Sequence, residues 1–167
     1  MIVLDASTLI LLTKADLLEK FLDHVGQQVA VPAKVERESC RVKKSIDALM
    51  IQKAIRENRI SVRTVKDRAL CSKLQSDFGL GGGEAEAVAL ALSERAALVG
   101  IDDRNGIHAC KLLKLGFTTA IGILVRMQEK GLLQKEEAVS KLGTLEQYGR
   151  YSPDIVADAH SKLEGTS

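Results

Sequence analysis

Short apolar runs alternate along this chain with longer segments of helical spacing. The runs at 2–4, 29–31, 97–101 and 117–120 are too short for buried helices, so we predict strands there, with a further edge strand at 60–65. Strands that alternate with helices favour a parallel sheet covered on both faces, because each crossover returns over the sheet. We therefore predict an α/β fold, a three-layer α/β/α sandwich with a short central parallel sheet.

Composition narrows the class of protein. A chain of 167 residues is long enough for one domain with a sizeable core. Its three cysteines are isolated and odd in number, which argues against a disulfide framework and a zinc site. The start lacks a signal-peptide pattern and no stretch approaches the length of a membrane span. We therefore expect a cytoplasmic protein that makes no contact with membranes.

Charge is unevenly distributed along the chain. Residues 37–73 hold 11 Lys and Arg against 4 Asp and Glu, a net +7, whereas the rest of the chain carries −5. A basic face beside an acidic site would suit a polyanion such as nucleic acid. A solvated, basic helix surface is an equally good interpretation.

Three consecutive glycines, at 81–83, precede a carboxylate and an Ala/Val/Leu-rich helical segment. Glycine tolerates backbone conformations that other residues avoid, so a tight turn that leads into a helix is predicted here. Glu84 then falls in the first helical turn, where the helix dipole favours a negative side chain. Glu86, two residues further on, is expected to face solvent.

Several carboxylates follow the predicted strands. Asp5 comes directly after the first strand, and Asp102 and Asp103 follow the third; Glu38 and Glu84 lie on helices. In open α/β sheets functional residues gather at the carboxyl ends of the strands. Close carboxylates repel one another unless a hard divalent cation neutralises them, and oxygen-only ligands suit Mg²⁺ or Mn²⁺. Such a cation could support hydrolysis of a phosphodiester bond.

Each acid also has a plain structural interpretation. Asp5 could be only a helix cap, and the segment at 102–106 could be a simple turn. Glu36 competes with Glu38 but lies on a different face of its helix, since Val35 and Glu38 are three residues apart. Ser7 and Thr8 could cap the first helix, or one of them could bind a metal-bound water.

Four motifs, in this order, resemble the PIN-domain family, which includes many toxin ribonucleases of the VapC type, and in particular an uncharacterised prokaryotic PIN-like subgroup. The motifs are Val3-Leu4-Asp5-Ala6-Ser7-Thr8, Val31-Pro32-x-x-Val35-x-x-Glu38, Gly83-Glu84-Ala85-Glu86-Ala87 and Ile101-Asp102-Asp103-Arg104. The resemblance implies catalytic roles for Asp5, Glu38, Glu84 and Asp102. It implies metal ligation by Asp5, Glu84 and Asp102, with Asp103 as a further ligand or a substitute for Asp102. Substrate contacts are expected from Ser7, Thr8 and Arg104.

The chain departs from the family pattern at two places. Asn105-Gly106-Ile107-His108 stands where basic residues are expected after the Asp pair, and Thr119-Ala120 stands where Gly-Thr is expected. These departures concern substrate contacts near that edge of the site and leave the acids unaffected.

The implied function is a metal-dependent endoribonuclease, the toxin of a toxin–antitoxin pair, with Mg²⁺ or Mn²⁺ as cofactor. Its nuclease domain would span residues 1–151, with a C-terminal helix at 152–167 on the same domain. The expected partners are RNA, an antitoxin and a second copy in a homodimer. A nucleotide cofactor is not expected, because the glycine turn lacks the third glycine of a dinucleotide-binding loop.

Two alternatives stay open. One is a non-catalytic RNA-binding or regulatory protein that keeps the same fold. The other is a phosphatase with Asp5 as its nucleophile, although position 7, where a second Asp is wanted, is Ser.

Overall fold

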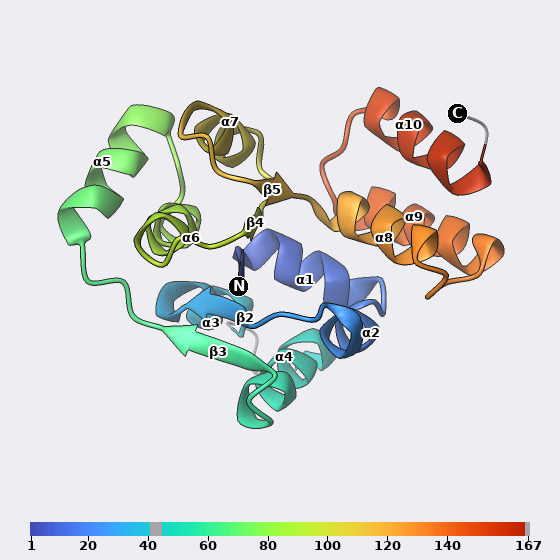
Figure 1. The fold of residues 1–167 in the computed structure, drawn as a ribbon, viewed down its shortest axis with the longest axis horizontal. Coiled ribbons are helices and arrows are strands. Elements are labelled where there is room, and N and C mark those ends of the chain that lie inside the picture. The colour runs from blue at the N-terminus through green and yellow to red at the C-terminus, as the bar shows by residue number, and fades with distance from the viewer. Residues whose placement is uncertain (41–44, 166–167) are drawn as a thin grey trace.

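A computed structural model describes residues 1–40 and 45–165 of the chain. At its centre lies a five-stranded parallel sheet with the strand order β3-β2-β1-β4-β5 (Figure 1). The strands are β1 (Ile2–Leu4), β2 (Val29–Pro32), β3 (Ile60–Arg63), β4 (Leu98–Gly100) and β5 (Phe117–Thr118). The predicted α/β class and the parallel sheet are confirmed. The last strand is shorter than predicted because Thr119 caps the helix that follows.

Helices connect the strands and cover the sheet. They are α1 (Ala6–Lys14), α2 (Leu18–His24), α3 (Ala33–Ser39), α4 (Ile46–Arg56), α5 (Arg68–Phe78), α6 (Gly82–Ser93), α7 (Arg104–Leu112), α8 (Ala120–Glu129), α9 (Lys135–Tyr148) and α10 (Pro153–Glu164). Side-chain caps begin several of them; Ser45 accepts a hydrogen bond from the Ala48 amide at the start of α4.

Two hydrophobic cores lie on opposite faces of the sheet, because successive side chains of a strand point to opposite faces. Val3 packs into the core under α5, α6 and α7, whereas Ile2 and Leu4 pack into the core under α1, α2, α4 and α8–α10. Figure 1 shows α5–α7 and α8–α10 as separate groups on either side of the central strands. This arrangement is the predicted three-layer sandwich.

The C-terminal helix α10 packs on α8 and α9. Ala159 and Leu163 of α10 are buried in the same core as β1. The proposed domain boundary at residue 151 stays a prediction.

Among the described residues, the helices are all too short or too polar to cross a membrane.

The expectation that Glu86 faces solvent is wrong. Glu86 lies on α6, whose sides contact β1, α3, α5 and α7, so even this carboxylate is only 3% exposed. Arg68 of α5 donates a hydrogen bond to its Oε1, while Oε2 is buried without a hydrogen-bond partner in the described part of the chain. The periodicity of the sequence suggested a solvated face of α6, but α5 covers that face.

Several cations of the basic stretch at 37–73 form ion pairs with acids of the same chain. Arg59 binds Glu19 and Asp23, Lys53 lies 3.7 Å from Glu19, and Lys73 pairs with Asp77 on α5. Residues 41–44 of this stretch lie outside the described part of the chain. Of these three cations Arg59 is largely covered, whereas Lys53 and Lys73 remain largely exposed.

Replacing Arg68 with Met should lower the free energy of unfolding, because it leaves the buried Glu86 carboxylate without its cation. The matched change Lys73→Met removes an ion pair with both partners exposed and should lower the free energy of unfolding much less. Urea unfolding of both variants measures the difference. Equal losses of stability would contradict the role assigned to Arg68.

Candidate active site

The sheet topology brings the first and third predicted acidic positions together. Strands β1 and β4 are parallel neighbours, with Leu4 paired with Gly100. The Asp5 amide continues this ladder by donating to the Gly100 carbonyl at 2.9 Å. Asp102 follows two residues later, so its carboxylate leaves the same edge of the sheet as that of Asp5.

The two carboxylate oxygens of Asp5 lie in different surroundings, and one of them caps helix α1. Its Oδ1 accepts a 2.7 Å hydrogen bond from the Thr8 amide at the start of α1. The side chain is fully buried, and its Oδ2 has no hydrogen-bond partner among the described residues. Burial raises the pKa of Asp5 from its ordinary 3.8 to about 8, and the negative charges of Asp102 and Glu84 add to the shift. A buried carboxylate oxygen without a partner is costly, which marks this atom as a binding position.

Asp102 is held from three sides. Thr8 donates its hydroxyl to Oδ2 at 2.6 Å, the Ala120 amide lies 3.1 Å from both oxygens, and Tyr151 donates its hydroxyl to Oδ1. Burial raises the pKa of Asp102, whereas these hydrogen bonds act to lower it. The three donors fix the orientation of the carboxylate at the start of α7.

Tyr151 is a site residue that the sequence analysis missed. It comes from the connection between α9 and α10, and burial together with the charge of Asp102 raises the pKa of its phenol, which therefore stays a donor. Gly149 permits this placement, because a Cβ there would collide with the Tyr151 ring. A tyrosine 49 residues beyond Asp102 carries no local pattern that predicts such a contact.

The glycine turn has a different physical reason from the predicted one. Gly82 and Gly83 are helical residues of α6, and a Cβ on Gly83 would collide with the carboxylate of Glu38. A Cβ on Gly82 would likewise collide with the ammonium of Lys34. A Cβ at either position would fit only if the flexible end of that side chain shifted, whereas the left-handed conformation occurs earlier, at Gly79 with φ +66°.

Glu84 occupies the first turn of α6, as predicted. Its Oε2 accepts a 2.8 Å hydrogen bond from the Gly81 amide, the N-cap. Burial raises the pKa of Glu84, and the neighbouring charges of Asp103 and Glu38 raise it further.

Between α1, α3 and α6 lies a small cavity of about 80 Å³, here called the acid pocket. It is lined by Asp5, Ala6, Ser7, Glu38, Gly81, Gly82, Gly83 and Glu84.

The members of each pair of alternatives left open by the sequence lie in different surroundings. Glu38 lines the acid pocket, whereas Glu36 lies near Cys40, whose thiol pKa it helps to raise. Asp102 accepts the hydrogen bonds of Thr8, Ala120 and Tyr151. Asp103 instead caps α7, with Oδ1 accepting from the amides of Asn105 and Gly106 at 2.8 and 3.3 Å.

The three predicted substrate contacts lie in different environments. Ser7 is exposed and lines the acid pocket. Thr8 is fully buried with its hydroxyl already donated to Asp102, so its place is to position that acid, out of reach of a substrate. Arg104 is exposed beside Asp102.

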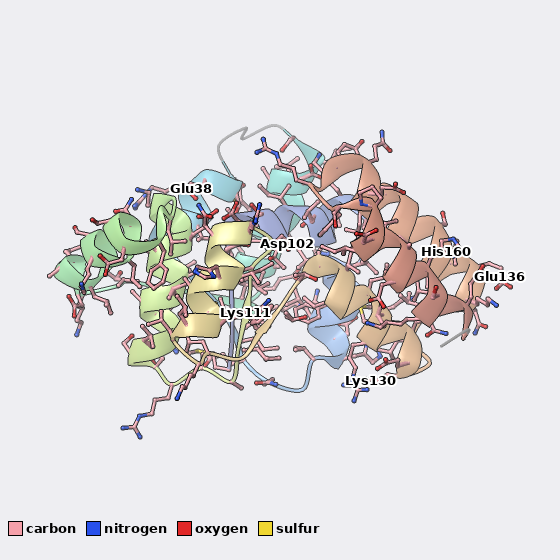
Figure 2. The ribbon with its side chains drawn as sticks, turned by 90° about the horizontal axis from the view of Figure 1, so that it is seen from above. Glu38, Asp102, Lys111, Lys130, Glu136 and His160 are labelled. Atoms are coloured by element: carbon pink, nitrogen blue, oxygen red, sulfur yellow. The ribbon has the colours of Figure 1, made fainter. Side chains whose placement is uncertain are left out.

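Two larger grooves meet at Asp102 and share Arg104 and Arg150 in their walls. The first groove, of about 530 Å³, is lined by Ser7, Ile10, Leu11, Lys14, Glu84, Asp102, Asp103, Arg104, Tyr148, Gly149 and Arg150. The second groove, of about 520 Å³, is lined by Asp102, Arg104, Ile107, His108, Lys111, Thr119, Arg150, Tyr151, Ser152 and Ile155. Figure 2 shows Asp102 near the centre of the molecule, between α7 and the C-terminal helices. Glu84 joins the acid pocket to the first groove, and Asp102 joins the two grooves.

The described acids are of the type that binds divalent metal ions, but they do not converge on one point. Within the described ranges, no three acidic, His or Cys side chains converge closely enough to hold an ion. Asp5, whose Oδ2 has no partner among the described residues, nevertheless lines a pocket whose other ionisable members are Glu38 and Glu84. Oxygen donors of this kind fit Mg²⁺ or Mn²⁺, which would replace the missing partner of Asp5.

A scan against models of protein families matched residues 1–164 to a family described as a PIN domain. Searches of curated proteins and of solved structures each gave no significant match. The family match covers nearly the whole chain, including all the acids described above.

Asp5→Asn should stabilise the metal-free protein, with an effect that grows with pH. Because the folded state raises the pKa of Asp5 to about 8, the stability that the bound proton contributes is complete below pH 4 and is lost as pH rises towards 8. At pH 8 in EDTA we expect the free energy of unfolding to rise by about 2 kcal/mol. This is less than the whole pKa shift would give, because the buried amide gains no new hydrogen-bond partner. Urea unfolding between pH 4 and 8 measures it. A pH-independent effect, or one equal to that of the exposed Glu146→Gln, would refute this account of Asp5.

Tyr151→Phe removes one donor from Asp102 and should lower the free energy of unfolding by about 1.5 kcal/mol, typical of a hydrogen bond to a charged group. The control is Tyr148→Phe, because Tyr148 is exposed and its ring, which Lys14 contacts at 4.6 Å, is retained. Its expected change is below about 0.5 kcal/mol. Urea unfolding at pH 8 compares the two, and similar values would show that Tyr151 contributes nothing through Asp102.

Proposed function

Because the chain belongs to the PIN-domain family, whose fold is generally a nuclease fold, we propose that it hydrolyses RNA phosphodiester bonds with the help of a divalent metal ion. More specifically, we propose a Mg²⁺- or Mn²⁺-dependent endoribonuclease.

One observation carries the proposal. Asp5 Oδ2 is buried and has no partner among the described residues, and Asp5 lines a pocket together with Glu38 and Glu84. PIN domains generally use divalent metal ions, and these three carboxylates would hold one. When bound, such an ion polarises a phosphate oxygen and lowers the pKa of a water molecule.

The surrounding residues support this chemistry by position and charge. Thr8, Ala120 and Tyr151 hold the Asp102 carboxylate at the junction of the two grooves, where its orientation is set before a substrate arrives. Arg104 and Arg150 stand beside it on the walls of both grooves, within reach of a phosphate. Anionic substrate is thereby attracted to a site that is otherwise acidic.

We extend the proposal to a toxin that a partner antitoxin holds in check, on the strength of the resemblance to toxin ribonucleases. The open first groove, with acids at one end and the apolar Ile10 and Leu11 in its wall, has room for a partner's side chains. A homodimer is proposed on the same resemblance.

A non-catalytic RNA-binding protein is the second candidate. It is favoured by the absence, among the described residues, of three acids close enough to hold an ion together. The phosphatase alternative has no such support, since exposed Ser7 stands where its acid/base group would be needed.

The test is cleavage of a mixed set of structured and single-stranded RNAs by purified protein in Mn²⁺, Mg²⁺ or EDTA. We expect cleavage that requires metal and is abolished by Asp5→Ala. Gly83→Ala should lower the rate about tenfold, because its Cβ displaces the Glu38 carboxylate from the acid pocket.

The control is Gly143→Ala in α9, where no heavy atom lies within 4 Å of the added Cβ and full activity is expected. Cleavage in EDTA, or a wild-type rate for Asp5→Ala, would overturn the proposal. Metal binding without cleavage would move the assignment to the non-catalytic candidate.

A further inference from the structure

The carboxylate of Asp102 has its acceptor positions filled by donors of the protein. Its Oδ2 accepts from the Thr8 hydroxyl at 2.6 Å, and its Oδ1 accepts from the Tyr151 hydroxyl. The Ala120 amide lies 3.1 Å from each of the two oxygens and is shared between them. A carboxylate offers about four lone-pair positions, and each oxygen here has two contacts. A cation can therefore bind Asp102 only if one of these donors leaves.

The three donors differ in how easily they can move. Thr8 and Ala120 are fully buried, the first in α1 and the second as the opening residue of α8, where the donor is the backbone itself. Tyr151 is half-buried and lies in the connection 149–152 between α9 and α10. In the described part of the chain, the amides of Arg150 and Tyr151 donate to no backbone carbonyl. A segment with so few backbone hydrogen bonds moves at low cost, so Tyr151 is the donor that can leave.

Tyr151 stands where Asp102 would meet the other acids. The acid pocket is lined by Asp5, Glu38 and Glu84, whereas Asp102 lines the two larger grooves. The charge of Asp102 helps to raise the pKa of Asp5, and the charge of Asp5 helps to raise the pKa of the Tyr151 phenol. The hydroxyl of Tyr151 is therefore close to both aspartates, bonded to one and within the field of the other.

We propose that Tyr151 is a latch on the metal site: in the metal-free protein its hydroxyl withholds Asp102 from a divalent cation, and Asp102 joins the cation only when Tyr151 moves away. This inference rests on the proposed function, whose metal site the latch regulates. Thr8 and Ala120 keep Asp102 oriented after the release. A tyrosine that merely positions Asp102 as a ligand has the opposite consequence, because its removal then weakens metal binding.

The first experiment is calorimetric titration of Mg²⁺ into the wild-type protein and Tyr151→Phe. The variant should bind Mg²⁺ about tenfold more tightly, because it has no hydrogen bond to a charged group to break before the cation binds. The same cycle requires that the stability lost by Tyr151→Phe in EDTA disappears at saturating Mg²⁺, since the metal-bound state no longer contains that bond. Urea unfolding under the two conditions measures this second quantity.

Gly149→Ala opens the latch without removing the hydroxyl. A Cβ at this position would collide with the Tyr151 ring and would stand 2.8 Å from the Leu145 carbonyl oxygen, so the ring must move. This variant should also bind Mg²⁺ more tightly than the wild type. The matched control is Gly143→Ala in the same helix region, where an added Cβ meets no heavy atom within 4 Å and wild-type affinity is expected.

Tyrosine fluorescence reports the latch directly. The chain has two tyrosines and no tryptophan, so in a Tyr148→Phe background Tyr151 is the only strong emitter. A phenol that donates to a carboxylate emits weakly, and its emission rises when that bond is broken. Mg²⁺ should therefore increase the emission with the dissociation constant that calorimetry gives, and EDTA should reverse the change. With Gly149→Ala added, the emission should be high before any metal is present.

Mg²⁺ binding by Tyr151→Phe that is equal to or weaker than that of the wild type would overturn the inference, as would emission that saturating Mg²⁺ leaves unchanged, or no Mg²⁺ binding by any of the proteins. RNA cleavage separates the two proposals. If the wild type cleaves RNA in Mg²⁺ while Tyr151→Phe binds the ion no more tightly, the latch fails and the proposed function stands. If Tyr151→Phe and Gly149→Ala both bind Mg²⁺ more tightly but no protein cleaves RNA, the latch stands and the proposed function fails.

Discussion

The burial of the Asp5 carboxylate is the constraint on which the rest of the site depends. The central strand of the sheet ends at this residue, and the following helix begins with its Oδ1 as cap, so the fold needs one of its oxygens. The other oxygen is buried and has no partner within residues 1–40 and 45–165, and the negative charges of Asp102 and Glu84 repel it. The metal-free protein accommodates this arrangement by raising the pKa of Asp5 to about 8. A cation in the acid pocket would remove the same penalty with the carboxylate ionised.

The hydrogen bonds to Asp102 join distant parts of the chain at one side chain. Thr8 comes from α1, Ala120 from the start of α8 and Tyr151 from the connection before α10. The C-terminal helices thus do more than fill the core, because the segment that joins them also forms part of the site. The same segment lines the second groove, where the cationic side chains of Arg104, Lys111 and Arg150 stand together with Asp102.

Much of this could be predicted from local patterns, since strands and helix starts are local features. The short runs ending at Asp5 and Asp102 predicted both the parallel sheet and the edge at which the acids lie. What could not be predicted depends on contacts between distant segments. Glu86 looked solvated because nothing in its own helix shows that α5 covers it. Tyr151 carries no local signal. Backbone freedom was predicted for the glycines at 82 and 83, but both are helical, and the ends of the Lys34 and Glu38 side chains lie where their Cβ atoms would be.

The most direct test of the central claim is calorimetric titration of Mn²⁺ into the wild-type protein and Asp5→Asn at pH 8, with the exposed Glu146→Gln as control. The account predicts saturable binding by the wild type and by the control, and loss of that binding in Asp5→Asn, which melts no lower than the wild type in EDTA. Binding of Mn²⁺ by Asp5→Asn with unchanged affinity, or no binding by the wild type, would contradict it.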